Sequence, residues 1–283
     1  TLFQMKAIIP VAGAGTKLRP HTYTQPKALI PLAGKPILKF IVDQLVEAGI
    51  HEFIFVIGYL GDKIQDYIEK KYPNLTCHFV QQNERQGPGH AVWLTKNIVG
   101  KDEIFISLGD TICEFDLPSV LNTPASTLGI KRVDDPRNFG VAEIDDNGKI
   151  LHVVEKPQIP RSNMALVGLY KIKETQQLFE CLEYNMKHSI KSHDEYHLTD
   201  ALECMIQGGV TFSTFKVANW FDCGRKDKLL ESNATLLKKY NLAKAPVLPF
   251  DNTIIIPPVS IDEGCNIKNS IIGPNVSIGE NTV

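Results

Sequence analysis

The segment that decides the fold lies near the start of the chain, where residues 5–20 are MKAIIPVAGAGTKLRP. An apolar run from Ala7 to Val11, interrupted only by a proline, leads into a loop with two glycines, a hydroxyl group and two cations. Glycine exposes backbone N–H groups and cations add positive charge, so this pattern is typical of a buried strand that ends at a phosphate-binding loop. A plain tight turn would explain the glycines but not Lys17 and Arg19 beside them.

Two common phosphate-binding motifs do not fit this loop. The pattern G-x-x-x-x-G-K-[ST] cannot be placed on it, so it is not a P-loop. Leu18 occupies the position of the third glycine of the dinucleotide motif G-x-G-x-x-G. The loop therefore predicts polyphosphate binding of another kind.

The rest of the first half alternates short apolar runs with amphipathic stretches. We expect strands at 53–57, 77–81 and 104–108, and helices at 35–49, 62–72 and 91–97. Continuous apolar strands separated by helices are typical of a mostly parallel sheet covered on both faces. The sequence therefore predicts an α/β, Rossmann-like fold.

The middle of the chain has a different pattern. Two alternating runs flank Asn147-Gly148, a dipeptide that is typical of a tight β-hairpin turn. The remaining predicted elements are a strand at 166–172, a helix from about 174 to 187, a helix around 197–207, a strand at 211–215 and a helix at 226–239.

The end of the chain carries a hexapeptide repeat. Apolar or small residues stand at 259, 265, 271, 277 and 283, and isoleucines stand at 255, 261 and 267, then one position early at 272 and 278. Such a repeat is typical of a left-handed parallel β-helix, whose coils bury one another's faces. We expect a main domain at 5–243 and a short or truncated β-helix at 251–283.

Composition excludes several classes of protein. The formal net charge of -2 leaves no global basic field, which argues against a nucleic-acid partner. No stretch approaches the ~20 apolar residues that a membrane span requires. The first four residues, TLFQ, lack the features of a signal peptide and resemble a remnant of expression cloning. Six widely spaced cysteines predict reduced thiols in a cytoplasmic protein.

Further motifs follow the glycine loop. GAGTKLRP at 13–20 is followed by PKALIP at 26–31 and KP at 35–36. This series resembles the sugar-1-phosphate nucleotidyltransferase family, whose signature is G-x-G-T-R-L-x-P, then P-K-x-L-x-P, then K-P. Members join a nucleoside triphosphate to a sugar 1-phosphate and release pyrophosphate.

The resemblance implies in-line attack of a sugar-phosphate oxygen on the α-phosphorus, with cations and Mg²⁺ neutralising two polyanions. Lys17 stands where the family has an arginine over the leaving phosphates, and Lys27 would contact the phosphates being joined. The nucleotide would lie against the loop residues Ala12, Gly13, Gly15 and Thr16.

Two aspartates match the family's magnesium ligands. Asp110 in SLGDTI follows an apolar strand, at the edge where open α/β sheets bind ligands. Asp222 in NWFDCG matches the motif W-x-D-x-G. Carboxylates suit Mg²⁺, which prefers hard oxygen ligands and keeps several waters. A capping or salt-bridged aspartate is the alternative for each.

The substrate side chains are also implied by the resemblance. The segment VQQNERQGPGHAV resembles the base-binding segment of relatives that use UTP or dTTP, with Gln82 and Gly87 bracketing the pyrimidine and Gln81 as the alternative in register. An amide can donate and accept at once, as a pyrimidine edge requires. On the sugar side, Glu155 would hold the hydroxyl groups of the sugar and Lys156 its phosphate. Gly140, Val167 and Gly168 would line the same pocket. Val167 fits ordinary strand core equally well.

A zinc pattern is rejected. His193 and His197 are four residues apart, but Asp194 stands where H-E-x-x-H needs glutamate, and no third ligand is apparent.

The sequence therefore predicts a cytoplasmic, Mg²⁺-dependent, homo-oligomeric nucleotidyltransferase that makes a nucleotide sugar. UTP or dTTP is the favoured nucleotide and glucose 1-phosphate the default sugar, with no nucleic-acid or membrane partner. One alternative is a catalytically weak, nucleotide-sugar-binding regulatory homologue, because Lys17 replaces the family arginine and Arg225 stands where many relatives have threonine. A second alternative, an acyltransferase in the β-helix, is disfavoured because the tail is short and no histidine follows His197.

Overall fold

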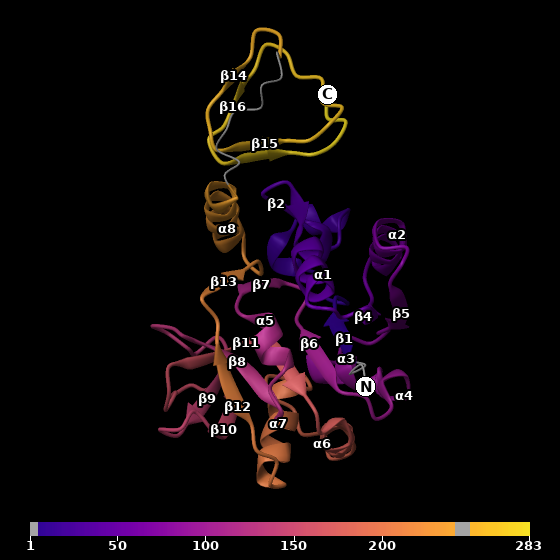
Figure 1. Cartoon of the computed structure of the whole chain (residues 1–283), viewed down its shortest axis with the longest axis vertical. Coiled ribbons are helices and arrows are strands. Elements are labelled where there is room, and N and C mark those ends of the chain that lie inside the picture. The colour runs from indigo at the N-terminus through magenta and orange to yellow at the C-terminus, as the bar shows by residue number, and fades with distance from the viewer. Residues whose placement is uncertain (1–4, 241–249) are drawn as a thin grey trace.

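The computed structural model describes residues 5–240 and 250–283 (Figure 1). The TLFQ segment and the predicted domain end at 243 lie outside these residues. Within them, a nine-stranded sheet forms the centre of the fold. Its main path is β10 (Ile150–Glu155), β9 (Gly140–Ile144), β11 (Met164–Ile172), β6 (Ile104–Ser107), β1 (Lys6–Pro10), β4 (Glu52–Ile57) and β5 (Thr76–Gln81). Off this path, β8 (Thr127–Arg132) pairs with β11, and β12 (Ser213–Lys216) pairs with β8.

The α/β class is confirmed, and the sheet is mixed. The strands β6, β1, β4 and β5 are parallel, as the alternation of strands and helices predicts. The second half of the chain adds β11, which is antiparallel to β6, β8 and β9, and the predicted antiparallel hairpin of β9 and β10. A short connection such as the Asn147-Gly148 turn can join only antiparallel neighbours, which explains the direction of β9 against β10.

Successive residues of a strand point to opposite faces of the sheet. Both faces are apolar here, and helices cover each of them. Ala7 and Ile9 of β1 belong to one buried cluster, with α1 (Ile37–Glu47), α2 (Gly61–Lys71), α5 (Leu117–Leu121) and α8 (Lys226–Lys239). Ile8 belongs to the other, with α3 (Pro88–Trp93), α4 (Lys96–Val99), α6 (Thr175–Lys187) and α7 (Leu198–Gln207). The helix expected at 91–97 is thus two short helices.

Several short elements lack a clear sequence signal. Three 3₁₀ helices follow β1, at Thr16–Leu18, His21–Tyr23 and Lys27–Leu29. A small hairpin of β2 (Pro31–Leu32) and β3 (Lys35–Pro36) comes next. A separate antiparallel pair, β7 (Thr111–Glu114) and β13 (Asn219–Asp222), joins two distant parts of the chain.

The C-terminal segment forms two pairs of parallel strands, seen beyond α8 in Figure 1. β14 (Ile254–Ile255) pairs with β16 (Ile271–Ile272), and β15 (Val259–Ile261) pairs with β17 (Val276–Ile278). Neighbouring turns are 17 residues apart, as in the contact of Asn252 with Asn269, one short of three six-residue repeats. The slip seen in the isoleucine series accounts for this spacing.

One part of the repeat assignment is wrong. The first series places Ile271 and Val283 on the same face as Val259, but Val259 is buried whereas Ile271 is 71% and Val283 96% exposed. The slip moves both series by one position, so a strict period of six cannot continue past it.

Asn233 of α8 fastens this C-terminal segment to the rest of the chain. Its Oδ1 accepts a hydrogen bond from the backbone N–H of Ala33 at 2.8 Å and from the Ser277 hydroxyl at 3.3 Å. Its Nδ2 donates to the carbonyl of Asn275 at 2.8 Å. One side chain thus joins the turn between β2 and β3 to the coiled segment.

The cysteine prediction is also corrected. Cys181 of α6 and Cys204 of α7 form a disulfide, with Cα atoms 5.9 Å apart, so not all six cysteines are reduced. The two helices pack side by side, which no local cysteine spacing reveals. Among the described residues, none of the helices combines the length and apolar character of a membrane span.

Candidate active site

Three strand ends meet at the glycine loop. The loop that follows β1 is flanked by Gly58, after β4, and Gly109, after β6. A Cβ atom on Gly58 would lie 2.8 Å from the carbonyl oxygen of Ala12, and one on Gly109 would lie 2.3 Å from Cγ1 of Val11. Both positions therefore require glycine. Sequence reasoning missed these two glycines, although each follows closely on a buried apolar strand.

The loop itself combines buried and exposed residues. Ala12 and Ala14 are buried, whereas Gly13, Thr16 and Lys17 are exposed. A Cβ atom on Gly13 would have no neighbour within 4 Å, so the backbone is open to a ligand there. This exposure of glycine backbone beside a hydroxyl and a cation fits the approach of a polyphosphate.

Gly15 gives the loop its turn. It adopts the left-handed conformation, with φ of 60°, and its carbonyl accepts a hydrogen bond from the Thr22 hydroxyl at 2.8 Å. A Cβ atom on Gly15 would lie 2.8 Å from Thr22 and 3.1 Å from Cβ of Lys27. Lys27 therefore packs directly against Gly15 of the loop.

Lys27 forms an ion pair with the predicted metal ligand Asp110. The Lys27 Nζ lies 2.5 Å from Oδ2 of Asp110, and the two side chains are 18% and 40% exposed. Burial would raise the pKa of Asp110, but the Lys27 ammonium and the Thr111 hydroxyl hold that pKa below its usual range. Asp110 therefore carries a negative charge at neutral pH.

The pairing of β7 with β13 brings Asp222 to the same place. Asp222 is opposite Thr111, the residue after Asp110, and the backbone N–H of Cys223 donates to the carbonyl of Asp110 at 3.1 Å. Oδ1 of Asp222 accepts from the N–H of Gly224, and a Cβ atom on Gly224 would lie only 3.5 Å from Nζ of Lys27. Two aspartates from distant parts of the sequence thus lie beside one lysine.

The donor set fits a magnesium ion that is held partly by substrate. In the described residues, no three histidine, cysteine, aspartate or glutamate side chains lie close enough to hold a metal by themselves. Mg²⁺ commonly binds through one or two carboxylates and takes its other ligands from water and phosphate. Asp110 and Asp222 supply two such carboxylates.

The predicted base-binding residues are also neighbours. Gln82 is buried, and its Nε2 donates to the carbonyl of Gly87 at 3.1 Å and lies 3.1 Å from Nδ1 of His90. Burial lowers the pKa of His90, so the neutral ring is favoured and one of its two nitrogens can accept a hydrogen bond. Gln81, the alternative in register, is exposed on β5. Gln82 thus contacts Gly87, and the choice between the two glutamines stays a prediction.

Glu155 is the centre of the predicted sugar site. Its side chain is only 9% exposed, and Oε1 lies 3.2 Å from Nζ of Lys156. A Cβ atom on Gly140 would lie 3.3 Å from Oε2 of Glu155, so glycine leaves room for the carboxylate. Glu155 also borders a cavity of about 600 Å³ between the β9–β10 hairpin and the helices α6 and α7.

Two residues beside Glu155 were missed as site residues. Oε2 accepts a hydrogen bond from the Thr199 hydroxyl at 2.7 Å, and Oε1 lies 3.3 Å from Nδ1 of His197. His197 is the residue directly before α7, and His193 lies earlier in the preceding loop. The two histidines therefore do not share a helix. Only the contact with Glu155, which is invisible in sequence, gives His197 a place in the site.

Val167 does not join the other sugar-site residues. It is buried in the apolar core, where it faces Gly129, so the alternative of ordinary strand core is what the structure shows. Gly168 beside it has φ of 81° at an irregularity of β11, and a Cβ atom there would lie 2.7 Å from Leu108.

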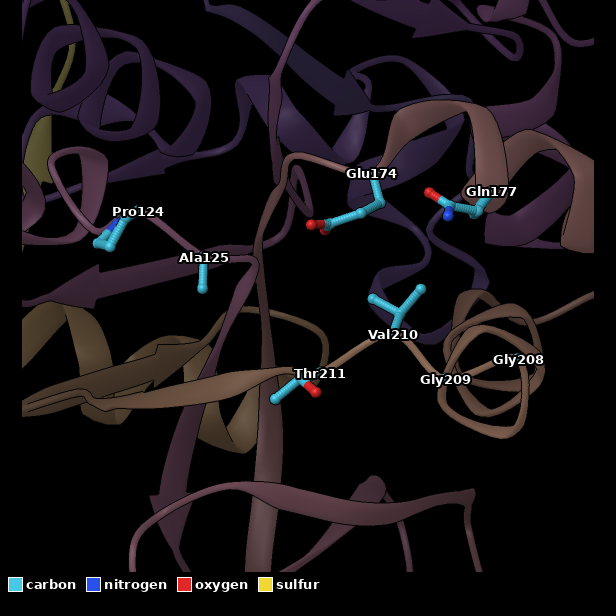
Figure 2. Close-up of a pocket in the computed structure, with 8 residues that line it drawn as sticks. All are labelled: Pro124, Ala125, Glu174, Gln177, Gly208, Gly209, Val210 and Thr211. Carbon is cyan, nitrogen blue, oxygen red and sulfur yellow. The ribbon is translucent and has the colours of Figure 1, made fainter.

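A separate cavity of about 390 Å³ lies away from these residues (Figure 2). The side chains of Glu174 and Gln177 border it on one side, and Val210 and Thr211 border it on the other. None of its lining residues is cationic. It is therefore unsuited to phosphate, and we assign it no part in the site.

Comparison with known proteins finds similarity in sequence to one family and to several of its members. A family model described as Nucleotidyl transferase matches residues 6–239. The bifunctional protein GlmU of Methanocaldococcus jannaschii is 37% identical over 92% of this chain, which spans 61% of that protein's length. The glucose-1-phosphate thymidylyltransferase of Streptomyces griseus is 31% identical over 98% of this chain and 79% of its own.

Solved structures give the same picture. A UDP-glucose pyrophosphorylase complexed with UDP-glucose has a TM-score of 0.73 and 25% identity, covering 83% of this chain and 99% of its own. A putative glucose-1-phosphate thymidylyltransferase from Bacillus anthracis has a TM-score of 0.70 and 26% identity, covering 82% of this chain and 94% of its own.

Proposed function

The chain belongs to the nucleotidyl transferase family, and from this membership we propose that it transfers a nucleotidyl group from a nucleoside triphosphate to a sugar 1-phosphate, releasing pyrophosphate. The observation that carries the proposal is the cluster of Lys27, Asp110 and Asp222 directly beside the glycine loop. A lysine and two carboxylates at an exposed backbone turn provide what phosphoryl chemistry needs, namely charge and alignment.

Each part of the reaction has residues that can serve it. The exposed backbone of Gly13 with Thr16 and Lys17 would hold the β- and γ-phosphates, and Lys17 would neutralise charge on the leaving pyrophosphate. Lys27 would contact the α-phosphate and the incoming sugar phosphate, holding the attacking oxygen in line with the leaving group. A magnesium ion at Asp110 and Asp222 would supply further charge neutralisation.

The substrate preferences follow from the two flanking sites. Nε2 of Gln82 is engaged by Gly87 and His90, which leaves the amide oxygen to accept from the ring N–H of uracil or thymine, so we propose UTP or dTTP as the nucleotide. Glu155 and Lys156 would bind the hydroxyl groups and phosphate of the sugar. The names of the thymidylyltransferase and pyrophosphorylase relatives support glucose 1-phosphate as the sugar.

We also propose that residues 251–283 are a separate domain that begins a left-handed parallel β-helix and mediates self-association. The parallel strand pairs support the β-helix, and the adjacent exposed side chains of Ile254 and Ile271 support the contact. Changing both isoleucines to glutamate should reduce the mass found by light scattering. An unchanged mass would place the contact elsewhere.

A pyrophosphate-release assay tests the main proposal. The purified chain is given Mg²⁺ and each pair of UTP, dTTP, ATP or GTP with glucose 1-phosphate, mannose 1-phosphate or an amino-sugar 1-phosphate. We expect the highest turnover with UTP or dTTP and glucose 1-phosphate, and background release from the Asp110→Asn control. A tenfold preference for ATP or GTP would refute the base assignment. Tight nucleotide-sugar binding without turnover would favour the regulatory homologue.

A further inference from the structure

The disulfide between α6 and α7 closes a ring that contains the loop between these helices. Cys181 lies in the middle of α6 and Cys204 in the last turn of α7, with their Cα atoms 5.9 Å apart. The two cysteines are 23 positions apart in sequence, and the connecting loop of residues 188–197 lies between them. Whether the disulfide is formed or broken therefore bears directly on this loop.

The connecting loop is held in a strained conformation. Ser189, His193 and Asp194 all have positive φ, of 54°, 51° and 64°. Residues with a Cβ atom rarely adopt this left-handed region, because Cβ comes too close to the following carbonyl oxygen. Such conformations persist only where the surrounding structure holds them. A loop with three of them should relax when a nearby constraint is removed.

The same loop contacts both of the proposed substrate subsites. The N–H of Tyr196 donates to the carbonyl of Gln86 at 2.8 Å, and the N–H of Gly89 donates to the carbonyl of Tyr196 at 2.7 Å. These two hydrogen bonds fasten the loop to the segment of the proposed base site. At the end of the loop, Nδ1 of His197 lies 3.3 Å from Oε1 of Glu155. A change in the loop therefore reaches the nucleotide and the sugar 1-phosphate together.

The two helices do not depend on the disulfide for their packing. Leu178 and Leu182 of α6 belong to the same buried cluster as Leu202 and Met205 of α7. Burial of these apolar side chains stabilises the contact whether or not the sulfur atoms are bonded. Reduction of the disulfide should therefore leave the fold intact and act on the strained loop.

The disulfide is within reach of thiols in solution. Cys181 and Cys204 are both partly exposed, and Cys204 borders the cavity of about 600 Å³ beside the β9–β10 hairpin. Cys113 and Cys223, by contrast, are buried. Exposed disulfides are the ones that thiols reduce most readily. The disulfide is therefore open to exchange with an external thiol.

We propose that Cys181 and Cys204 form a thiol–disulfide switch that tunes substrate binding, an inference whose kinetic part rests on the proposed function. A thiolate of an external dithiol attacks one sulfur of the disulfide, forms a mixed disulfide and releases the other cysteine as a thiolate, which takes up a proton. The second thiol of the reagent then displaces the remaining cysteine. Two electrons and two protons pass to the protein, and the dithiol becomes a cyclic disulfide.

The prediction of a cytoplasmic protein agrees with a switch. Lasting disulfides are rare in cytoplasmic proteins, and those that form there are usually transient and catalytic or redox-sensing. With the disulfide formed, the ring holds the strained loop against both subsites. With the disulfide reduced, the loop relaxes and both substrates bind more weakly.

Hydrogen exchange and nucleotide binding in two redox states test the switch. The full chain is treated with oxidised glutathione or with dithiothreitol, and alkylation under denaturing conditions should find four free thiols in the first state and six in the second. Cys181→Ser with Cys204→Ser gives a chain that cannot form the disulfide. Cys265→Ser is the control, since its partly buried thiol lies in the C-terminal segment, where it donates to the carbonyl of Gly279.

Reduction should speed amide exchange in residues 188–197 while α6 and α7 keep most of their protection. The Kd for UTP with Mg²⁺, measured by calorimetry, and the KM for each substrate should rise about fivefold or more, the lower end of coupling between sites. The double serine variant should show the reduced values in both states. Cys265→Ser should respond to dithiothreitol as the wild type does, and reoxidation should restore the tighter binding.

Several outcomes would overturn the inference. Equal exchange in residues 188–197, or equal affinity for UTP, in the two redox states would make the disulfide a structural cross-link only. Six free thiols after treatment with oxidised glutathione would mean that the disulfide does not form. If the double variant fails to fold, the two states of the wild type decide. A chain that is inactive on every substrate pair would refute the proposed function, while its exchange and its affinity for UTP would still decide the switch.

Discussion

Gly13 allows the phosphate-binding role of the loop to be tested without disturbing the fold. A Cβ atom on Gly13 would have no neighbour within 4 Å, so the methyl group of Gly13→Ala meets no other part of the protein. Replacing glycine at a position that alanine tolerates usually stabilises by about 0.4–1 kcal/mol, since the unfolded chain loses freedom. The variant should therefore be at least as stable as the wild type.

The activity of Gly13→Ala should nevertheless fall. A phosphate that approaches the backbone within hydrogen-bond distance would meet the new methyl group and move by about an ångström. Displacements of that size can reduce rates about 100-fold. We therefore expect kcat/KM for the nucleoside triphosphate to fall by about two orders of magnitude, with the KM for sugar 1-phosphate much less affected.

Gly109→Ala is the matched control for Gly13→Ala. Its Cβ atom would lie 2.3 Å from Cγ1 of Val11 and 2.9 Å from the carbonyl oxygen of Pro10, and overpacking of this kind costs about 1–3 kcal/mol. Thermal unfolding should show a Tm below that of the wild type for Gly109→Ala and no decrease in Tm for Gly13→Ala. If Gly13→Ala keeps the wild-type kcat/KM, no phosphate approaches this backbone, and the interpretation of the loop is refuted.

Three further predictions concern charged groups. Lys17→Ala should lower turnover roughly 100-fold while Lys17→Arg keeps it, measured with saturating Mg²⁺; an active alanine variant would make Lys17 an ordinary surface residue. Asp110→Asn and Asp222→Asn should each lower turnover by about two orders of magnitude with unchanged circular dichroism, and near-normal activity would remove that aspartate from the metal site. Burial, with the nearby charge of Glu155, raises the pKa of Asp200, so ionisation of Asp200 destabilises the folded state as the pH rises through and beyond the usual aspartate range. Asp200→Asn should therefore have a higher Tm than the wild type at neutral pH and an equal Tm below about pH 4, and a lower Tm at neutral pH would contradict this.

The local elements of the fold could be predicted from sequence because their signals are local. The strands at 53–57 and 104–108 are continuous apolar runs, and the helix of residues 37–47 has an apolar face with glycine at its end. The turn at Asn147-Gly148 has the residues that its conformation requires. Each of these segments carries enough information to specify its own conformation.

Contacts between distant segments could not be predicted in this way. The pairing of β7 with β13 places Asp222 beside Asp110, but both strands are only four residues long and carry no distinctive period. The disulfide of Cys181 with Cys204 depends on the packing of two helices. Thr199 likewise differs from any buried threonine only by the carboxylate that it contacts. Family resemblance supplied Asp222, and nothing in the sequence supplied Thr199.

The hydrogen bonds of Asn233 have a consequence for how the chain can be shortened. A fragment that ends after α8 would remove the carbonyl of Asn275 and the hydroxyl of Ser277, two of the three partners of this amide. The same truncation would expose the turn between β2 and β3, where Ser260 packs against Gly34. Asn233 also accepts a hydrogen bond from the N–H of Ala33. A protein expressed with residues 250–283 should therefore be more stable than one that ends after α8.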